Sequence, residues 1–207
     1  MNLTFPEING LTYKRLSQRI RVISETWLKN EMYCPACGNE YLSKLPNNSK
    51  LADFRCNECG EIYELKSKGG TIGKTIIDGA YYAAIERITS STNPNLFVLR
   101  YEGNIIHDLT LVPKYFFTAD TLKIRRALSQ QARRAGYIGA VIMYGNIPQQ
   151  GKIDVVVSQN EIAKDTVMKN YSRAVSLKVK DINIRGWLMD IMICIDRIDG
   201  EIFSLND

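Results

Sequence analysis

The chain has 207 residues, of which 45% are hydrophobic and 24% are charged, so it can bury the core of one good-sized domain or two small ones. Its longest strongly apolar stretch, from Trp187 to Ile195, is interrupted by Asp190 and is shorter than the roughly 18 residues that a membrane span needs. The N-terminal segment lacks the basic start and the apolar run of a secretory signal, so we expect a cytoplasmic protein without a membrane partner. Disulfides are not expected in that reducing compartment, and the five cysteines need another explanation.

The basic excess of the chain is concentrated in one segment. The net charge is +5, and residues 121–153 carry Lys and Arg side chains but no Asp or Glu, so the rest of the chain is close to neutral. Contact with phosphate groups requires cations that are gathered on one face, so this segment predicts a surface for nucleic acid. A basic face that only meets solvent is the alternative.

The first part of the chain is predicted to hold a helix, a polar module and a strand. Apolar residues recur at helical spacing over residues 13–29, which predicts an amphipathic helix whose apolar stripe holds Leu16, Ile20, Ile23 and Trp27. Residues 34–60 are rich in Cys, Asn, Pro and Gly, which favours a small metal-organised module. Residues 61–66 alternate between polar and apolar side chains, which predicts a strand.

The next elements are predicted to be one helix and several strands. We expect a helix over residues 79–89 and strands over residues 95–101 and 109–113, from their periodicity and their β-branched and aromatic content. Residues 140–144 and 152–158 flank a turn-rich segment, so we expect them to form a hairpin or a pair of neighbouring strands.

A last helix is expected near residues 186–198. Cys194 lies on its apolar stripe and is expected to be a small core residue. Helices and strands that are intermixed in this order indicate an α/β or α+β domain with a central sheet.

Four of the five cysteines form two Cys-x-x-Cys pairs. Cys34 and Cys37 are separated from Cys56 and Cys59 by 18 residues, which is the spacing of a four-cysteine zinc site. Two residues between paired cysteines let both sulfur atoms reach one ion, and four thiolates leave no position open for water. The sequence therefore predicts a structural Zn²⁺ ion, and two unrelated turns or a redox pair are the alternative.

Acidic and basic side chains follow each other around the second cysteine pair. Asp53 precedes the pair, and Glu64, Leu65 and Lys66 follow it on the predicted strand, where Glu64 and Lys66 face the same way. Two carboxylates and the Leu65 carbonyl are the hard oxygen ligands that Mg²⁺ prefers, and Lys66 can orient an attacking water molecule. This pattern predicts hydrolysis of a phosphodiester, and a solvated salt bridge on an exposed strand is the alternative.

Three other titratable residues are weaker candidates. Glu25 lies opposite the apolar stripe of the first helix, so we expect it to face solvent rather than to assist a metal site. Asp78 is expected to cap the helix that begins near Gly79. His107 is the single histidine and is expected on the surface. The sequence therefore does not favour a catalytic mechanism in which a histidine activates a nucleophile.

Several segments together resemble a known family over essentially the entire chain. The segments are YCPACGNE, LADFRCNECGEIYELKSKGG, DGAYYAAIERI, NPNLFVL, ARRAGYIGA and IRGWLMDIMICIDRI, and in order and spacing they resemble the DpnI-like methyl-directed restriction endonucleases. The resemblance implies a PD-(D/E)xK fold, which is a central mixed sheet flanked by helices, here with an inserted four-cysteine zinc site. It also implies Mg²⁺-dependent cleavage of double-stranded DNA at GATC sites that contain N6-methyladenine, with no small-molecule cofactor.

The resemblance assigns roles to individual residues. It implies that Asp53, Glu64 and Lys66 are catalytic, which agrees with the expectation from the residues themselves that Asp53, Glu64 and Leu65 hold the magnesium ion. It implies that the zinc ligands are the four paired cysteines, Cys34, Cys37, Cys56 and Cys59. Residues 1–199 would form the nuclease domain, with its zinc site at 34–59, and residues 200–207 would lead toward a C-terminal winged-helix domain that the chain does not contain.

The basic segment is the part of this domain that we expect on DNA. The candidates for DNA contact are Arg125, Arg126, Arg133, Arg134 and Tyr137. Arginine side chains can bind phosphates or guanine edges, and the family has a tryptophan at the position of Tyr137, where an aromatic ring can stack on bases. A surface loop whose tyrosine packs into the core is the alternative.

Two further functions remain open from the sequence. A zinc module can bind methylated DNA without cutting it, with Asp53, Glu64 and Lys66 left as a salt-bridge cluster. A repair nuclease of the same fold can have a different specificity. Incubation of DNA with Mg²⁺ or Mn²⁺ distinguishes the first alternative, and comparison of methylated with unmethylated duplexes distinguishes the second.

Overall fold

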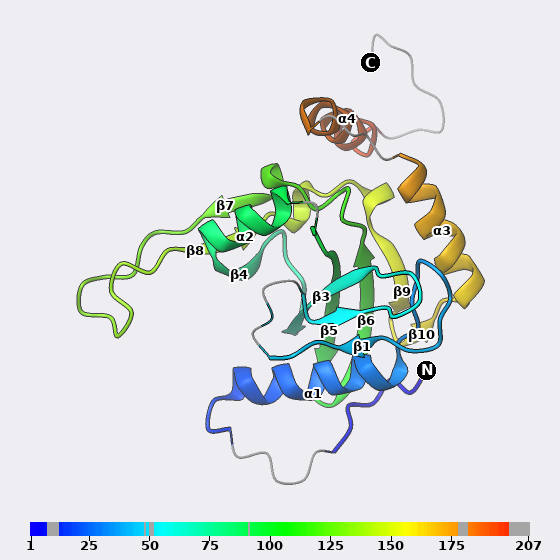
Figure 1. Cartoon of the computed structure of the whole chain (residues 1–207), viewed down its shortest axis with the longest axis horizontal. Helices are drawn as coiled ribbons and strands as arrows, with labels where there is room; N and C mark the ends of the chain where they lie inside the picture. The colour runs from blue at the N-terminus through cyan, green and yellow to red at the C-terminus, as the bar shows by residue number, and fades with distance from the viewer. Residues whose placement is uncertain (8–12, 48, 50–51, 91, 178–181, 199–207) are drawn as a thin grey trace.

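The computed structural model describes residues 1–7, 13–47, 49, 52–90, 92–177 and 182–198. A seven-stranded sheet forms its centre, in the strand order β1-β2-β3-β5-β6-β9-β10 (Figure 1). Its strands are β1 (Ser43–Lys44), β2 (Phe54–Arg55), β3 (Ile62–Gly69), β5 (Asn95–Glu102), β6 (Ile105–Val112), β9 (Ile153–Val157) and β10 (Asn160–Glu161).

The sheet is mixed, because β3 and β5 run parallel while the other paired strands described in it are antiparallel. The parallel pair is in register from Tyr63 opposite Asn95 to Gly69 opposite Tyr101. A parallel pair needs a crossover, and the chain between β3 and β5 supplies one that contains β4 (Ile76–Ala80) and α2 (Tyr81–Thr89). This crossover brings β4 and α2 next to the acidic side chains of β3.

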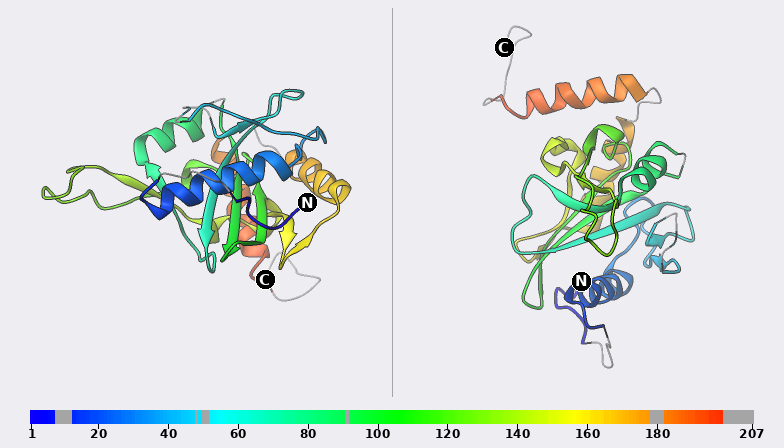
Figure 2. Two further views of the ribbon diagram at one scale, coloured as in Figure 1. Left: turned by 90° about the horizontal axis from the view of Figure 1, so that it is seen from below. Right: turned by 90° about the vertical axis from the view of Figure 1, so that its left-hand side faces the viewer.

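A smaller three-stranded sheet has the order β4-β8-β7, with β7 at Leu122–Ile124 and β8 at Gly139–Ile142. All of its pairs are antiparallel, and α2 packs on it. The chain between β7 and β8 projects from the body of the molecule, as two views show (Figures 1 and 2).

Three further helices cover the sheet or lie beside it. Helix α1 (Leu16–Glu31) packs against β1 and β3, and α3 (Lys164–Ser176) packs against β9. Helix α4 (Ile182–Ile195) stands at the periphery and meets the short 3-10 helix at Gln149–Gly151 (Figure 1). Two more 3-10 turns lie at Ala119–Thr121 and Tyr144–Asn146.

The core lies between the larger sheet and helices α1 and α3. Large side chains with less than 2% exposure come from α1 and its C-cap, from the cysteine-rich segment, from the central strands and from the loop after β6: Trp27, Leu28, Met32, Leu42, Phe54, Tyr63, Leu96, Phe97, Leu99, Ile106, Leu109 and Phe117. Burial of side chains of this size is worth about 1.5–3 kcal/mol each, so this cluster supplies the main stabilising contribution. No helix in the described part of the chain is long and apolar enough to cross a bilayer.

The predicted fold class is confirmed, since the chain forms a mixed α+β structure with a central mixed sheet and flanking helices. The helix predicted over residues 13–29 is α1, and the strand predicted over residues 61–66 is β3. The strands predicted at 95–101 and 109–113 correspond to β5 and to the end of β6. Helix α3 was not predicted, because its buried face holds only Val167, Tyr171 and Ala174.

Three predictions of local structure are wrong. Residues 140–144 and 152–158 do not form a hairpin or neighbouring strands, because β8 pairs in the smaller sheet whereas β9 pairs in the larger one. Cys194 is exposed rather than in the core, because α4 turns Met189 inward and its Trp187 remains 65% exposed. His107, which was expected on the surface, lies within β6 and is half-buried.

The segment 200–207, where we expected the approach to a winged-helix domain, lies outside the described residues.

Candidate active site

The four paired cysteines lie together at the β2–β3 hairpin. Their sulfur atoms all lie within 4.8 Å of one another, and two of the pairs, Cys34–Cys59 and Cys37–Cys56, are 3.6 Å apart. Four thiolates bound to one Zn²⁺ ion at about 2.3 Å would be separated by about 3.8 Å. The cluster therefore fits a structural zinc ion, as the spacing predicted.

The chemistry of this donor set also favours a cation. Burial raises the pKa of the Cys34 thiol to about 11. Burial alone would also raise the pKa of Cys56, but backbone N–H groups of Glu58 and Cys59 that donate to its sulfur lower it to about 7. A thiolate at Cys56 beside three other sulfur atoms is stabilised by a metal ion, which deprotonates its ligands on binding.

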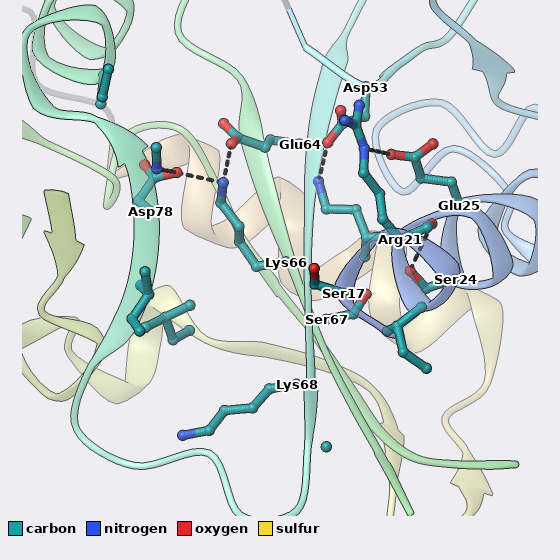
Figure 3. A pocket seen from close by; sticks show the side chains of 18 of the residues that line it. Ser17, Arg21, Ser24, Glu25, Asp53, Glu64, Lys66, Ser67, Lys68 and Asp78 are labelled. Carbon is teal, nitrogen blue, oxygen red and sulfur yellow. Dashed lines mark hydrogen bonds and ion pairs between the residues drawn. The ribbon is translucent and has the colours of Figure 1, made fainter. Parts of the chain in front are cut away.

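A cleft of about 1010 Å³ opens beside this hairpin. Helix α1 forms one wall, β3 forms its floor, and β4 and α2 form the opposite wall (Figure 3). Asp53, Glu64 and Lys66 all line the cleft, so the structure brings the three proposed catalytic residues into one cavity.

Glu64 and Lys66 point to the same side of β3, as the alternation of a strand predicts. The Lys66 ammonium lies 2.6 Å from a Glu64 oxygen and 2.5 Å from Oδ1 of Asp78 (Figure 3). Burial alone would lower the pKa of Lys66, but the carboxylates of Glu64 and Asp78 outweigh burial and raise that pKa above its ordinary value. The ammonium therefore remains charged at neutral pH.

Asp53 immediately precedes β2, and its Oδ2 accepts a hydrogen bond of 2.9 Å from the backbone N–H of Leu65. Its own N–H donates to the carbonyl of Tyr63, so backbone hydrogen bonds fix its position. In an extended strand the N–H and C=O of one residue point to the same edge, so the Leu65 carbonyl points to the edge of β3 on which Asp53 lies. Burial raises the pKa of Asp53, and the charges of Glu64 and Glu25 act in the same direction.

Arg87, in the last turn of α2, was not singled out from the sequence. Its guanidinium lies 2.7 Å from the second carboxylate oxygen of Glu64. Glu64 as a whole is only 5% exposed. No sequence motif indicates this pair, since the contact arises only when the crossover packs α2 over β3.

Glu25 does not face solvent, so that prediction is wrong. The residue is 3% exposed and lines the cleft. Its carboxylate lies 2.6 Å from Arg21 and 2.7 Å from Lys44 of β1. The face of α1 opposite the apolar stripe is covered by the cysteine-rich segment, which the helical pattern alone does not reveal. Glu25 thus adds a third carboxylate near Asp53 and Glu64.

Asp78 does not cap a helix, because α2 begins at Tyr81 and its N-cap is Ala80, which makes no side-chain cap hydrogen bond. Asp78 lies instead on β4, is 9% exposed, and accepts a hydrogen bond of 2.7 Å from the N–H of Gly79. Burial alone would raise the pKa of Asp78, but Lys66 lowers it. The residue is a fourth carboxylate of the cleft.

The candidates for DNA contact lie on or beside the projecting β7–β8 connection. Arg125, Arg126, Arg133 and Arg134 are exposed, and Tyr137 is half-buried with its ring 3.9 Å from the guanidinium carbon of Arg134. Backbone hydrogen bonds between Leu128 and Tyr137 and between Gly136 and Leu128 close the connection on itself. The arginine side chains are therefore presented to solvent on a folded extension.

A mixed sheet flanked by helices, with one acidic residue just before β2 and a second acidic residue and a lysine on β3, all at one cleft, has the architecture of the PD-(D/E)xK class of nucleases. Comparison with family models gives the particular family. The model of the Dam-replacing family matches residues 1–180, and that of the Dam-replacing HTH domain matches residues 183–207. The chain therefore belongs to the Dam-replacing family of DpnI-like restriction nucleases, which bind DNA.

Proposed function

We propose that the chain is a Mg²⁺-dependent endonuclease that cleaves double-stranded DNA at GATC sites containing N6-methyladenine. The observation that carries the proposal is the convergence of Asp53, Glu64 and Lys66 in one cleft of about 1010 Å³. Membership of the Dam-replacing family supports the methylated substrate. We place the protein in the cytoplasm, where reduced thiols can bind zinc.

The donor set of the cleft fits a magnesium ion. Asp53 and Glu64 supply carboxylate oxygens, and the Leu65 carbonyl faces the same edge of β3. The raised pKa of Asp53 reflects burial and neighbouring negative charge, and a divalent cation relieves both. When bound, Mg²⁺ would polarise the scissile phosphate and acidify a water molecule.

The protein side chains would perform the remaining steps. Lys66, held charged by its two carboxylate partners, would donate hydrogen bonds to the water that attacks phosphorus and to the phosphate oxygen on which negative charge develops. Arg87 would keep the Glu64 carboxylate turned into the cleft. The cysteine cluster would fix the hairpin that carries Asp53 and Glu64.

The arginines of the β7–β8 connection would bind the DNA backbone. Their exposure and the absence of acidic residues from 121 to 153 support this role. Each phosphate contact contributes about 0.9 to the slope of log affinity against log salt. Replacement of Arg133 and Arg134 by Ala should therefore lower this slope by about 2 if each binds one phosphate.

The proposal is tested with a plasmid methylated at the adenine of GATC and an unmethylated plasmid of the same sequence, each incubated with Mg²⁺. We expect fragments from the methylated plasmid only. Removal of a transition-state donor costs about 10²–10³ in rate, so Lys66→Ala should abolish visible cleavage while Lys169→Ala, on the exposed face of α3, should not. Cleavage by Lys66→Ala at the wild-type rate would contradict the proposed site.

The same experiment distinguishes the two alternatives. A non-cleaving binding module would retain methylated duplex and give no product with Mg²⁺ or Mn²⁺. A repair nuclease of the same fold would cleave methylated and unmethylated plasmids alike.

A further inference from the structure

Asp78 reaches the acidic cleft from a different sheet than the residues it contacts. Glu64 and Lys66 lie on β3 of the larger sheet, whereas Asp78 lies on β4 of the smaller sheet. Its Oδ1 is nevertheless 2.5 Å from the Lys66 ammonium, between the two sheets (Figure 3). The two carboxylates that bind Lys66 are therefore anchored independently of each other.

The backbone of β4 is irregular at this position. The pairing of β4 with β8 shifts register between Asp78 and Ala80, which is the signature of a β-bulge. Bulges re-aim side chains and occur often next to active sites. Together with the hydrogen bond from Gly79 N–H, the bulge fixes the Asp78 carboxylate toward the cleft.

Asp78 is not satisfied by contacts within the described chain alone. Its side chain is buried, and its Oδ2 has no hydrogen-bond partner among the described residues. A buried carboxylate oxygen without a partner is less favourable than one that accepts a hydrogen bond. In the part of the chain that the structure describes, Oδ2 is thus left unpaired while Oδ1 binds the Lys66 ammonium.

Under the proposed function, a divalent ion competes with cationic side chains for the Glu64 carboxylate. Without a divalent ion, its carboxylate pairs with Lys66 and Arg87. A cation at Asp53 and Glu64 would draw charge from the Glu64 carboxylate and would also repel the nearby ammonium. Asp78 has no ionic partner other than Lys66 among the described ion pairs, so its contact need not weaken when Glu64 binds the ion.

We propose that Asp78 is a positioning residue, which holds the Lys66 ammonium in the cleft when Glu64 turns to the divalent ion. The inference rests on the proposed function and extends it. Asp78 acts through Lys66 and does not itself bind the metal or the substrate.

The first test follows the Lys66 ammonium group by NMR in the full chain, with Lys66→Arg to assign its signal. Ca²⁺ is the probe, because it binds oxygen ligands as Mg²⁺ does. An ammonium group gives an NMR signal when its protons exchange slowly with water. In the wild-type protein we expect the Lys66 ammonium signal both with and without Ca²⁺. In Asp78→Asn we expect the signal without Ca²⁺ and its loss with Ca²⁺. If the wild-type protein itself loses the Lys66 signal on addition of Ca²⁺, Asp78 does not hold the ammonium and the inference is overturned.

The second test separates positioning from a structural role. Asp78→Asn keeps the size of the side chain and removes its charge. We expect an at least tenfold lower single-turnover rate of cleavage, an unchanged KM, and a protein that stays folded at the assay temperature. The control Asp120→Asn, at an exposed 3-10 turn, should keep the wild-type rate. A loss of rate that is matched by a loss of folded protein would contradict a positioning role.

The outcomes also distinguish this inference from the proposed function. A wild-type protein that fails to cleave methylated DNA contradicts the proposed function itself. If wild type cleaves and Lys66→Ala does not, but Asp78→Asn cleaves at the wild-type rate and keeps its Lys66 signal in Ca²⁺, only the role of Asp78 is overturned.

Discussion

The cysteine cluster and the acidic cleft share one hairpin but are assembled in opposite ways. The cysteine cluster takes its four members from two turns that lie within residues 34–59, and their spacing is set by local backbone geometry. The cleft draws its charged residues from α1, from the β2–β3 hairpin, from β4 and from α2. The first site depends on sequence spacing, and the second depends on how the elements pack.

The largest effect is expected when the cysteine cluster is broken. Zinc binding to such sites is worth about 10–16 kcal/mol, which is comparable to the whole stability of a domain. Cys56→Ser should therefore unfold the β2–β3 hairpin and abolish cleavage, as measured by hydrogen exchange at Phe54 and by the plasmid digest. Cys194→Ser, at an exposed cysteine outside the cluster, is the matched control and should change neither. Protection at Phe54 that survives in Cys56→Ser would contradict a structural zinc site.

Breaking an ion pair at the wall of the cleft should have a smaller effect. Glu25→Gln leaves Arg21 and Lys44 without their carboxylate, and both cations keep partial contact with solvent. We expect the free energy of unfolding to fall by about 2 kcal/mol, measured by urea denaturation. Glu40→Gln, at an exposed position of the same region, should change it by less than about 0.5 kcal/mol. Equal values for the two variants would mean that Glu25 is not part of a buried network.

One hydrogen bond connects the two sites. The hydroxyl of the fully buried Tyr63 lies 3.1 Å from the sulfur of Cys34, and Tyr63 precedes Glu64 on β3. Tyr63→Phe should lower the free energy of unfolding by about 1 kcal/mol and speed zinc transfer to a chelator. Tyr41→Phe, at a tyrosine that is 64% exposed, is the control. Unchanged zinc transfer in Tyr63→Phe would show that this hydroxyl does not stabilise the bound thiolate.

The smallest effect is expected from pH. Because the folded-state pKa of Asp78 is lowered by Lys66, its contribution to stability is present above the ordinary Asp pKa of about 3.9 and is lost as the pH falls through the lowered value. The difference in unfolding free energy between wild type and Asp78→Asn should therefore be constant near neutral pH and shrink toward pH 3. A difference that grows on acidification would contradict this sign.

Residues close in sequence could be predicted well. The Cys-x-x-Cys spacing located all four members of the cysteine cluster, and strand alternation placed Glu64 and Lys66 on one face. Both results follow because turns and strands have a fixed local geometry that sequence spacing reports directly.

Residues brought to the cleft by packing could not be predicted in the same way. Glu25 is covered by a segment that follows its helix, and a helical wheel contains no such information. Asp78 reaches Lys66 because β4 pairs with β8, which lies about 60 residues further along the chain. Arg87 depends on the same crossover. Long-range pairing of this kind leaves no periodic signal in the sequence.

The central claim is that Asp53, Glu64 and the Leu65 carbonyl form a divalent metal site beside Lys66. The most direct measurement is anomalous X-ray scattering from crystals of the protein soaked in Mn²⁺. We predict an anomalous peak within coordination distance of the Asp53 and Glu64 carboxylates. A fully loaded crystal with manganese elsewhere and none between these two carboxylates would contradict the account.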